Sequence, residues 1–443
     1  MLSFKINSTD LEDRLLVPFY EVIRITNKSK ITIGDIADEI TNGIDLRNYK
    51  DEGPLYLRGS DIKRCQIDLL TPKHVDFPIN KIPDKIKLEP GDILMTRKGT
   101  VGVTSIFSSE PRDLIIGTEI IKIRLKKNNE ISPEYLYTFL NSKPGILQVI
   151  SKLTGTVARG INHQSLKKIK VFTPSQKEKE QIDSWIKEAK IKHWKAITMI
   201  EAAKEKLMSI LGFPAMSNAM NFKVSSNLLE TDSFTPRFYH PAYTKPIEIL
   251  KKNFETIKLG EISKIRKGDE VGSDNYRDYT NKLDTDVPFI RTSDLPNYEI
   301  DDYPDFYIDK GFFEELKQDL LPNDILFSND GKIGYSAIFT SVDKCVIQSH
   351  IRRIRILETF RPEYILVFLN NIYGKQQVKR RVVIQSTIPT IGDGLKEIKI
   401  PKIDSNSENE IADIVNEAYK LKAEKKLLIR NAKNLIEKII KES

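Results

Sequence analysis

The chain has 443 residues, of which 40% are hydrophobic and 30% charged, with a formal net charge of +8 and a pI near 9.0. This length favours two or three domains over one core, and no apolar run approaches the ~20 residues that span a membrane. The two cysteines, Cys65 and Cys345, lie far apart and have no Cys or His at metal-ligand spacing. We therefore expect a cytoplasmic protein with no metal site, and the basic charge suits a polyanionic partner.

The predicted elements divide the chain into six segments. In order, these are a lead-in (1–30), a first β-rich domain (31–174), a long helix (175–212), a linker with a second lead-in (213–256), a second β-rich domain (257–403) and a last long helix (404–443). The start of the chain lacks the basic residues and continuous apolar segment of a signal peptide. The expected fold class is α+β, with each β-rich domain followed by a long helix.

The two long helices carry apolar residues at alternating steps of three and four, which is the spacing of a coiled-coil seam. Each helix would be a rod of about 50 Å at ~1.5 Å per residue. A single exposed seam needs a partner, so we expect the two helices to pair as an antiparallel coiled coil. His193 and Lys425 are polar seam members that would either fix the register or take part in partner docking. The residues predicted to pair the helices are Ile182, Ile186, Ile200, Leu207, Ile411, Leu421, Leu428 and Leu435.

The second β-rich domain repeats the first in sequence, with landmarks in the same order. The segments 55–62 (LYLRGSDI), 90–102 (PGDILMTRKGTVG) and 133–141 (PEYLYTFLN) match 288–295 (PFIRTSDL), 322–334 (PNDILFSNDGKIG) and 362–370 (PEYILVFLN). The segments starting at Asp92 and Asp324 are typical of a buried strand, and those starting at Pro133 and Pro362 of a helix. The two glycines near the end of each of the segments 90–102 and 322–334 predict a turn with unusual dihedral angles.

The two copies differ most in the polar residues of their loops. The turn after the buried strand reads TRKGT (96–100) in one copy and SNDGK (328–332) in the other. After the next strand, GTE (117–119) is replaced by QSH (348–350). A shared scaffold with different loop side chains predicts two related binding modules with different targets.

At these landmarks the chain resembles the specificity subunit of type I restriction-modification systems. Further motifs of the resemblance are GTVARGINHQSLKKIKVFTP (155–174) followed by EKEQI (178–182), and TPRFYHP (235–241). The second exit, 386–401, departs from this pattern, and the following 402–410 lacks the usual Glu-Gln. The boundary of the second module is therefore open.

The resemblance implies a DNA-binding subunit with two target-recognition domains and no chemistry of its own. Each domain would read one half of a bipartite double-stranded DNA site, while the helices set the spacing and dock two modification (methyltransferase) subunits. A motor-nuclease subunit would join for cleavage in this prokaryotic defence against foreign DNA. S-adenosylmethionine, Mg²⁺ and ATP would belong to the partner subunits, so we expect no cofactor here.

Base reading needs paired donors or acceptors, such as Arg for guanine and Asn or Gln for adenine, whereas Lys and Arg also anchor phosphates. Arg58 and Arg291 occur in both copies and favour a scaffold or phosphate role. The basic runs at 352–355 and 379–381 are either solvated faces or phosphate anchors. The candidate DNA-binding residues are Arg58, Arg97, Lys98, Thr100, Arg159, Asn162, His163, Arg291, Asn329, Lys332, Gln348, His350, Arg353, Lys379, Arg380 and Gln385.

Two alternatives from other classes stay open. Asp305, Glu315 and Lys317 fit the spaced acids and lysine of a Mg²⁺-dependent nuclease, although a surface turn with a short helix explains them as well. The chain lacks a nucleotide-binding Gly-x-x-x-x-Gly-Lys-Ser/Thr loop and the methylase Asn/Asp-Pro-Pro-Tyr/Phe motif. A repeat adaptor that binds other proteins would show no affinity for DNA.

Overall fold

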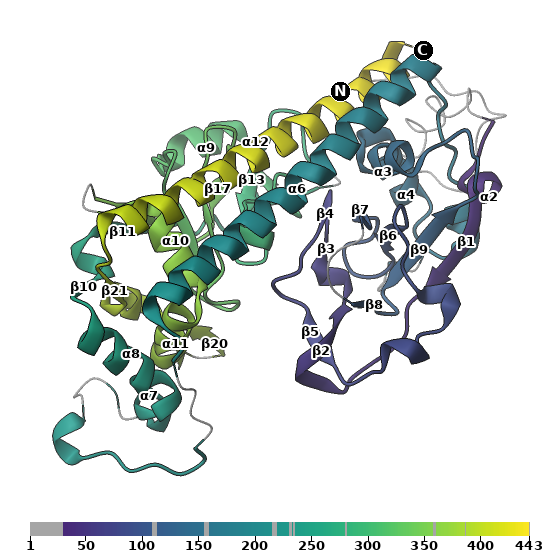
Figure 1. Ribbon diagram of the computed structural model, residues 1–443. Coiled ribbons are helices and arrows are strands. Elements are labelled where there is room, and N and C mark those ends of the chain that lie inside the picture. Colours follow the sequence, from purple (N-terminus) through teal and green to yellow (C-terminus); the bar gives the residue numbers. More distant parts are fainter. Residues whose placement is uncertain are drawn as a thin grey trace. The chain divides into compact units, whose positions relative to one another are not determined.

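The computed structural model describes residues 30–108, 113–154, 159–214, 219–229, 233, 235–279, 281–357, 360–385 and 387–442 (Figure 1). These residues belong to two compact units. Unit 1 comprises Met1–Ile191 with Lys425–Ser443, and unit 2 comprises Lys192–Glu424. Each unit thus holds one β-rich domain and part of each long helix. Nearly all of the expected lead-in at 1–30 lies outside the described residues, as does the side chain of Gln385.

Unit 1 is organised around an antiparallel sheet with the strand order β1-β9-β6-β7. A second sheet, β5-β2-β8, joins β2 to β8 in parallel, and β3 pairs with β4. The strands are β1 (Ala37–Asn42), β2 (Tyr49–Leu57), β3 (Ile62–Lys63), β4 (Gln66–Ile67), β5 (Lys73–Val75), β6 (Ile93–Thr96), β7 (Thr104–Ile106), β8 (Leu114–Ile116) and β9 (Ile120–Leu125). The helices of this domain are α2 (Ile33–Ile36), α3 (Pro133–Asn141), α4 (Lys143–Ser151) and α5 (His163–Lys167).

Unit 2 repeats this arrangement. Its central sheet has the order β11-β18-β15-β16, and a second sheet, β12-β14-β13-β17, joins β13 to β17 in parallel. The strands are β10 (Thr256–Lys258), β11 (Ser263–Lys267), β12 (Arg277–Asp278), β13 (Val287–Ile290), β14 (Phe306–Ile308), β15 (Ile325–Ser328), β16 (Ser336–Ile338), β17 (Val346–Ile347), β18 (Ile351–Ile356), β19 (Val383–Gln385), β20 (Ile388–Thr390) and β21 (Lys399–Pro401). The helices are α7 (Pro236–Tyr239), α8 (Pro241–Asn253), α9 (Lys310–Leu316), α10 (Pro362–Asn370) and α11 (Ile372–Arg381).

The predicted starts of strand and helix are confirmed in both copies. Every residue of β6 and of β15 is buried, because each is a central strand covered on both faces. Helix α3 begins at Pro133, and the Ser132 hydroxyl accepts a hydrogen bond from the Tyr135 N–H as its N-cap. Helix α10 likewise begins with a proline, Pro362, but its N-cap residue Arg361 makes no side-chain capping hydrogen bond. The expected α+β class with an internal repeat is therefore confirmed.

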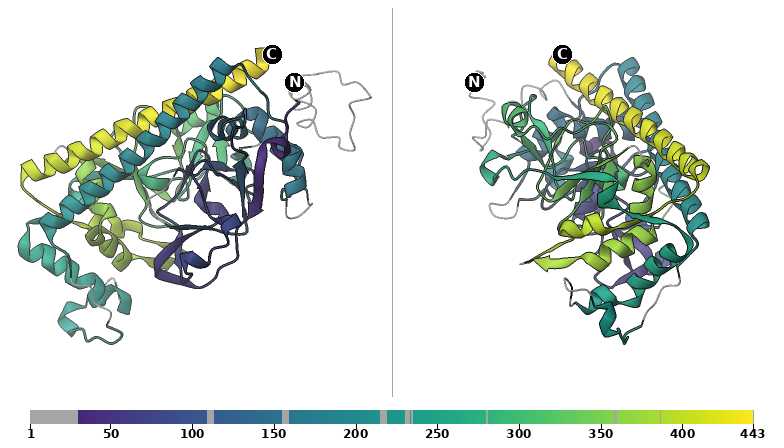
Figure 2. Two further views of the ribbon diagram at one scale, coloured as in Figure 1. Left: turned by 45° about the vertical axis from the view of Figure 1, so that its right-hand side comes forward. Right: turned by 90° about the vertical axis from the view of Figure 1, so that its left-hand side faces the viewer.

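The long helices are α6 (Gln176–Leu211) and α12 (Ser405–Glu442), drawn in teal and yellow in Figure 1 and again in both views of Figure 2. Within unit 2, Lys192 Nζ lies 2.6 Å from Glu424 Oε2, and Lys206 pairs with Glu410. A higher number on α6 pairs with a lower number on α12, so the helices run antiparallel, as predicted. None of the helices in the described ranges combines the length and hydropathy of a membrane-spanning segment.

The buried face of α12 is wider than a two-residue seam. Ile182, Ile186, Ile200, Leu207, Ile411 and Leu421 are buried. Leu428 and Leu435 are only partly buried, whereas their neighbours Ile429 and Ile436 are buried. The wider face arises because the helix packs against a β-rich domain as well as a helix, which broadens the apolar stripe. The pairing roles of the individual residues stay predictions.

Candidate nucleic-acid interface

In unit 2, three loops that are far apart in the sequence meet. The turn between β15 and β16 is bonded to the turn before β18, because the Asn329 N–H donates to the His350 carbonyl at 2.9 Å. The β19–β20 hairpin joins through the Gly331 N–H, which donates to the Pro389 carbonyl at 2.8 Å, and the Ile391 N–H, which donates to the Asn329 carbonyl at 3.1 Å. We call this meeting point junction 2; it comprises 328–334, 348–350, 383–385 and 387–392.

Unit 1 forms the same junction from the corresponding loops. The Arg97 N–H donates to the Glu119 carbonyl at 2.8 Å, and the Ile161 N–H donates to the Arg97 carbonyl at 3.2 Å. Lys98 forms a backbone bridge with Gly160, as Asp330 does with Thr390 in unit 2. Junction 1 comprises 96–102, 117–119 and 159–163. Backbone hydrogen bonds build both junctions, so the side chains are free to differ between them.

The predicted glycine turns shape both junctions. Gly102 has a φ of +83° and Gly334 a φ of +94°, which is a conformation that side chains other than glycine rarely adopt. A Cβ on Gly102 would lie 2.6 Å from Val149 Cγ1, whereas a Cβ on Gly334 would lie 3.7 Å from Val378 Cγ1. The turn in unit 1 is therefore packed more tightly than its counterpart.

A partly buried carboxylate, that of Asp330, organises the side chains of junction 2. Asp330 Oδ2 lies 2.7 Å from His350 Nδ1, and Asp330 Oδ1 accepts hydrogen bonds from Asn329 Nδ2 at 2.8 Å and from the Thr390 hydroxyl. Burial opposes ionisation, but the hydrogen bonds from Thr390, His350 and Asn329 outweigh it and lower the pKa of Asp330. The carboxylate is thus ionised and ties together all three loops.

Junction 1 presents basic side chains instead. Lys98 and Arg159 are exposed, and Arg97 is half-buried. His163 Nε2 lies 2.9 Å from Asn42 Oδ1. Burial, and then the nearby cations Arg97 and Lys167, lower the pKa of His163, which favours the neutral imidazole. The charged side chains therefore suit a phosphate backbone at this junction.

The chemical character of equivalent positions is reversed between the junctions. Lys98 in junction 1 is equivalent to Asp330 in junction 2. Lys98 follows Arg97, which is bonded to the β8–β9 turn, and Asp330 follows Asn329, which is bonded to the β17–β18 turn. Glu119 likewise stands where His350 stands. A ligand that binds one junction through its side chains would therefore meet different donors and acceptors at the other.

Several predicted DNA-binding residues also have structural partners within their own domain. The Asn162 carbonyl oxygen Oδ1 accepts from the Ser165 N–H at 2.8 Å and caps α5. Asn329 is 0% exposed, so it supports junction 2 from within. Thr100, Lys332 and Gln348 are half-buried on the junction turns, and Lys379 is exposed at the end of α11. Contact of these residues with DNA stays a prediction.

Two arginines of the basic runs point inward. Arg353 is 7% exposed, and its Nη1 donates to the Asp319 carbonyl at 3.0 Å. Arg380 Nε donates to the Phe238 carbonyl at 2.8 Å, and its guanidinium lies 3.7 Å from the centre of the Phe238 ring. These contacts attach α11 and β18 to neighbouring segments, which explains part of the basic charge without a ligand.

The arginines shared by both copies are anchored by buried acids. Arg58 Nη2 donates to Asp61 Oδ1 at 3.0 Å, and Arg291 Nε donates to Asp294 Oδ2 at 3.3 Å. Both aspartates are buried. This geometry favours the scaffold role over the phosphate role for both arginines.

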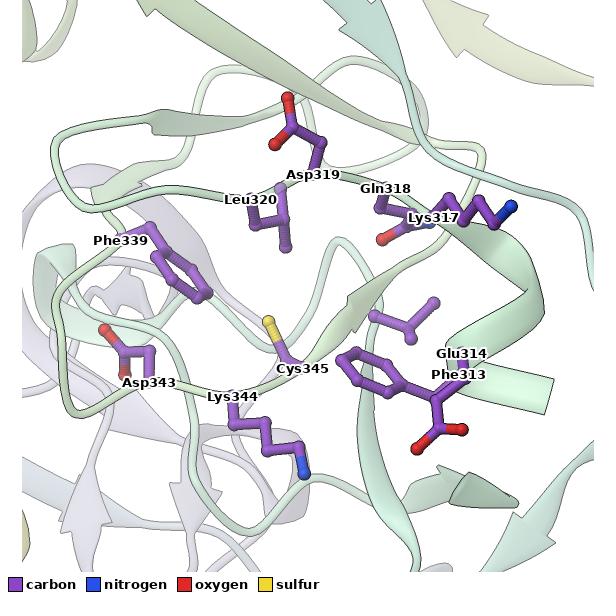
Figure 3. Close-up of a pocket in the computed structure, with 11 residues that line it drawn as sticks. Phe313, Glu314, Lys317, Gln318, Asp319, Leu320, Phe339, Asp343, Lys344 and Cys345 are labelled. Atoms are coloured by element: carbon purple, nitrogen blue, oxygen red, sulfur yellow. The ribbon is translucent and has the colours of Figure 1, made fainter. Parts of the chain in front are cut away.

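The nuclease alternative finds no support in the described residues. Asp305 Oδ2 accepts a hydrogen bond from Arg291 Nη2 at 2.9 Å, while Glu315 is an exposed residue of α9. Lys317 instead lines a cavity of about 380 Å³ with Phe313, Leu320, Phe339 and Cys345 (Figure 3). Across the described ranges, His, Cys, Asp and Glu side chains form no group of three or more that could hold a metal ion.

Comparison with known families decides the assignment. The family model of the type I restriction modification DNA specificity domain matches the chain twice, over residues 19–189 and 251–431. The chain belongs to this family. The β-rich part of each unit lies within one match, so the two junctions are equivalent sites in two specificity domains, and the chain is a DNA specificity subunit.

Solved structures of specificity subunits are similar to the chain over most of its length. The type I restriction-modification S subunit from M. genitalium is 16% identical, covers 93% of this chain and 96% of its own, and has a TM-score of 0.36. The HsdS subunit from Thermoanaerobacter tengcongensis is 13% identical, covers 93% of this chain and 95% of its own, and has a TM-score of 0.30. Among curated proteins, none matches the chain.

Sequence reasoning missed the residues that position the specificity-domain loops. Asp330 was not a predicted site residue, although it contacts three side chains of junction 2. Glu119 and Thr390 were missed as well. The available signal was their position, because Asp330 and Glu119 fall in the loop segments that differ between the two copies.

Proposed function

We propose that each specificity domain reads one half of a bipartite double-stranded DNA site through its junction. The observation that carries this proposal is the pair of junctions, which share their backbone hydrogen bonds and differ in their side chains. Shared backbone geometry gives both domains the same approach to a duplex, while base-edge contacts depend on side-chain donors and acceptors. Two such domains would read two different half-sites.

The β19–β20 hairpin supports a groove-facing role for junction 2. Ile384 is 76% exposed, and Val383 and Ile388 are also exposed, beside the polar network of Asp330. Exposed apolar side chains next to hydrogen-bonding groups suit a base edge that carries a methyl group, as thymine does in the major groove. A two-stranded ribbon also fits the width of that groove.

The paired helices would set the distance between the two half-sites. Helix α6 has 36 residues, which corresponds to about 54 Å at ~1.5 Å per residue. Half-sites on one face of a duplex recur about every 34 Å, so a rigid helix pair of this length is long enough to fix the spacing. We also assign to these helices the docking of two modification subunits.

The chain would do no chemistry itself. Methylation would require S-adenosylmethionine on the modification subunits, and cleavage would require Mg²⁺ and ATP on a motor-nuclease subunit. In this assignment the chain supplies sequence recognition and works in the prokaryotic cytoplasm.

Methylome sequencing tests the proposal directly. Cells that express the chain with its modification subunit are compared with cells that lack the chain. We expect a gapped, bipartite motif of methylated adenine that appears only with the chain. Replacing 257–403 by the corresponding domain of another specificity subunit should change one half of the motif only. Methylation that does not depend on the chain would contradict the proposal.

A further inference from the structure

The imidazole of His350 is oriented by the carboxylate of Asp330 in junction 2. Its Nδ1 lies 2.7 Å from Asp330 Oδ2. Asp330 Oδ1 is already engaged by Asn329 Nδ2 and the Thr390 hydroxyl, so the carboxylate is fixed on both sides. The Asp330 side chain is 14% exposed, whereas the His350 side chain is 38% exposed. The ring is therefore held at one nitrogen and open to the surface.

This contact determines which nitrogen of the ring carries the proton. An ionised carboxylate only accepts hydrogen bonds, so His350 Nδ1 must be the donor. In the neutral ring, Nε2 then has no proton and is an acceptor. When the ring is protonated, Nε2 becomes a donor while the contact with Asp330 is kept. Protonation thus inverts the hydrogen-bonding character of Nε2 without moving the side chain.

We propose that His350 reads a base of the second half-site and that its preferred base changes with pH, with Asp330 as its positioning residue. This inference rests on the proposed function. A neutral His350 would accept from the exocyclic amino group of adenine or cytosine, whereas a protonated His350 would donate to N7 or O6 of guanine. The second half-site would therefore have one position whose preference changes from an amino-bearing base to guanine as the pH falls.

The charged groups near the His350 ring lie on junction 2 and on the elements packed against it. Asp330 contacts the imidazole directly, through its Oδ2. Its own titration lies at lower pH, because its hydrogen bonds favour the ionised form. Ser349 Oγ donates to Glu270 Oε2 at 2.7 Å, which engages that carboxylate. Other charged residues on the neighbouring elements are Lys332 on the same turn, Asp269 bridged to Gln348, and Lys267 paired in register with Arg352. Arg291 follows Ile290, whose carbonyl accepts a hydrogen bond from the Gln348 N–H, and its guanidinium is bonded to Asp294 and Asp305.

Junction 1 provides an internal control. Glu119 stands at the position of His350, and a carboxylate is an acceptor throughout the range in which histidine titrates. The pKa of His163, the histidine of junction 1, is lowered by burial and then by two cations, and its Nε2 lies 2.9 Å from Asn42 Oδ1. The preference of the first half-site is thus expected to stay constant.

The test is a binding selection from a library of random duplexes at about pH 5.5 and about pH 8, on either side of the ordinary histidine pKa. The protein is the complete chain in its complex with the modification subunits. We expect a bipartite motif at both values, with one position of the second half-site changing its preference about tenfold. His350→Gln should remove this change, because an amide does not titrate in this range. Asp330→Asn should weaken it, because an amide no longer fixes the tautomer.

The two half-sites distinguish the possible outcomes. Retention of the first half-site in each variant shows that the complex assembles, and retention of the other positions of the second half-site shows that the domain with His350 is folded. A bipartite motif without a pH-dependent position would overturn the assignment of His350 alone, as would a pH-dependent position that persists in His350→Gln. A failure to select any motif at either pH would overturn the proposed function and this inference with it.

Discussion

The side-chain amide of Gln148 forms two hydrogen bonds with the backbone of Lys170. Nε2 donates to the Lys170 carbonyl at 2.8 Å, and the Lys170 N–H donates to Oε1 at 2.9 Å. Gln377 forms the same pair with Lys399, at 2.9 and 2.8 Å. Each glutamine fastens a domain helix to the segment that leads into a long helix. The connection between each recognition domain and its long helix is thus made by the same pair of hydrogen bonds in both copies.

Replacing either glutamine should destabilise its own unit. In Gln148→Ala, the carbonyl and N–H of Lys170 lose their partners, and Gln148 is almost fully buried, so we expect a loss of about 2–3 kcal/mol in the free energy of unfolding. Gln377→Ala should have a similar effect. Urea unfolding measures both. The exposed Gln181→Ala is the matched control and should be near neutral. An unchanged midpoint for both buried variants would contradict this account.

The repeat, the long helices and the buried strands were predictable because they depend on local spacing. In Ile93–Thr96, for example, all four consecutive residues are buried. The contact of Asp330 with Thr390 was not predictable, because it requires the β19–β20 hairpin to fold back on a turn about sixty residues earlier, and long-range contacts leave no periodic signal. Arg380 was predicted as a DNA contact from its charge, although the structure gives it a carbonyl and a ring as partners.

Alanine substitutions of the two turn glycines should differ in cost. Gly102→Ala and Gly334→Ala both place a side chain at positive φ, which costs about 1–2 kcal/mol. Only Gly102→Ala also creates an overlap, because its Cβ would lie 2.6 Å from Val149 Cγ1. We therefore expect Gly102→Ala to lower the free energy of unfolding more than Gly334→Ala does. The two variants serve as controls for each other, and equal losses would show that packing against Val149 has no role.

The stability of unit 1 should depend on pH through His163. Burial and the cations Arg97 and Lys167 place the folded-state pKa below the ordinary value of about 6.5. The unfolded state then binds the proton more readily, so the stabilisation is complete above about pH 6.5 and is lost as the pH falls through the folded-state pKa.

Urea midpoints at about pH 7.5 and about pH 5 measure this effect, and the histidine variant isolates it. His163→Gln keeps a side chain that can hydrogen-bond to Asn42 but does not titrate, so its midpoint should fall less on acidification than that of the wild type. In a nuclear magnetic resonance titration, the pKa obtained from the His163 resonance should lie below the ordinary histidine value. A resonance that titrates above pH 6.5 would contradict the prediction.

The exposed cations of junction 1 should contribute affinity without selecting bases. Lys98 and Arg159 are exposed on two of its three loops, where a phosphate backbone would be within reach of long side chains. Lys98→Ala and Arg159→Ala should each weaken DNA binding similarly across sequences and reduce the slope of log K against log salt by about 1. Lys127→Ala is the matched control, because Lys127 is also exposed but follows the opposite end of β9. Binding measured from low to high salt with one duplex that carries the methylated motif and one that lacks it distinguishes the roles. If either variant changed the preference between the two duplexes and left the salt slope unchanged, that residue would be reading a base rather than holding a phosphate.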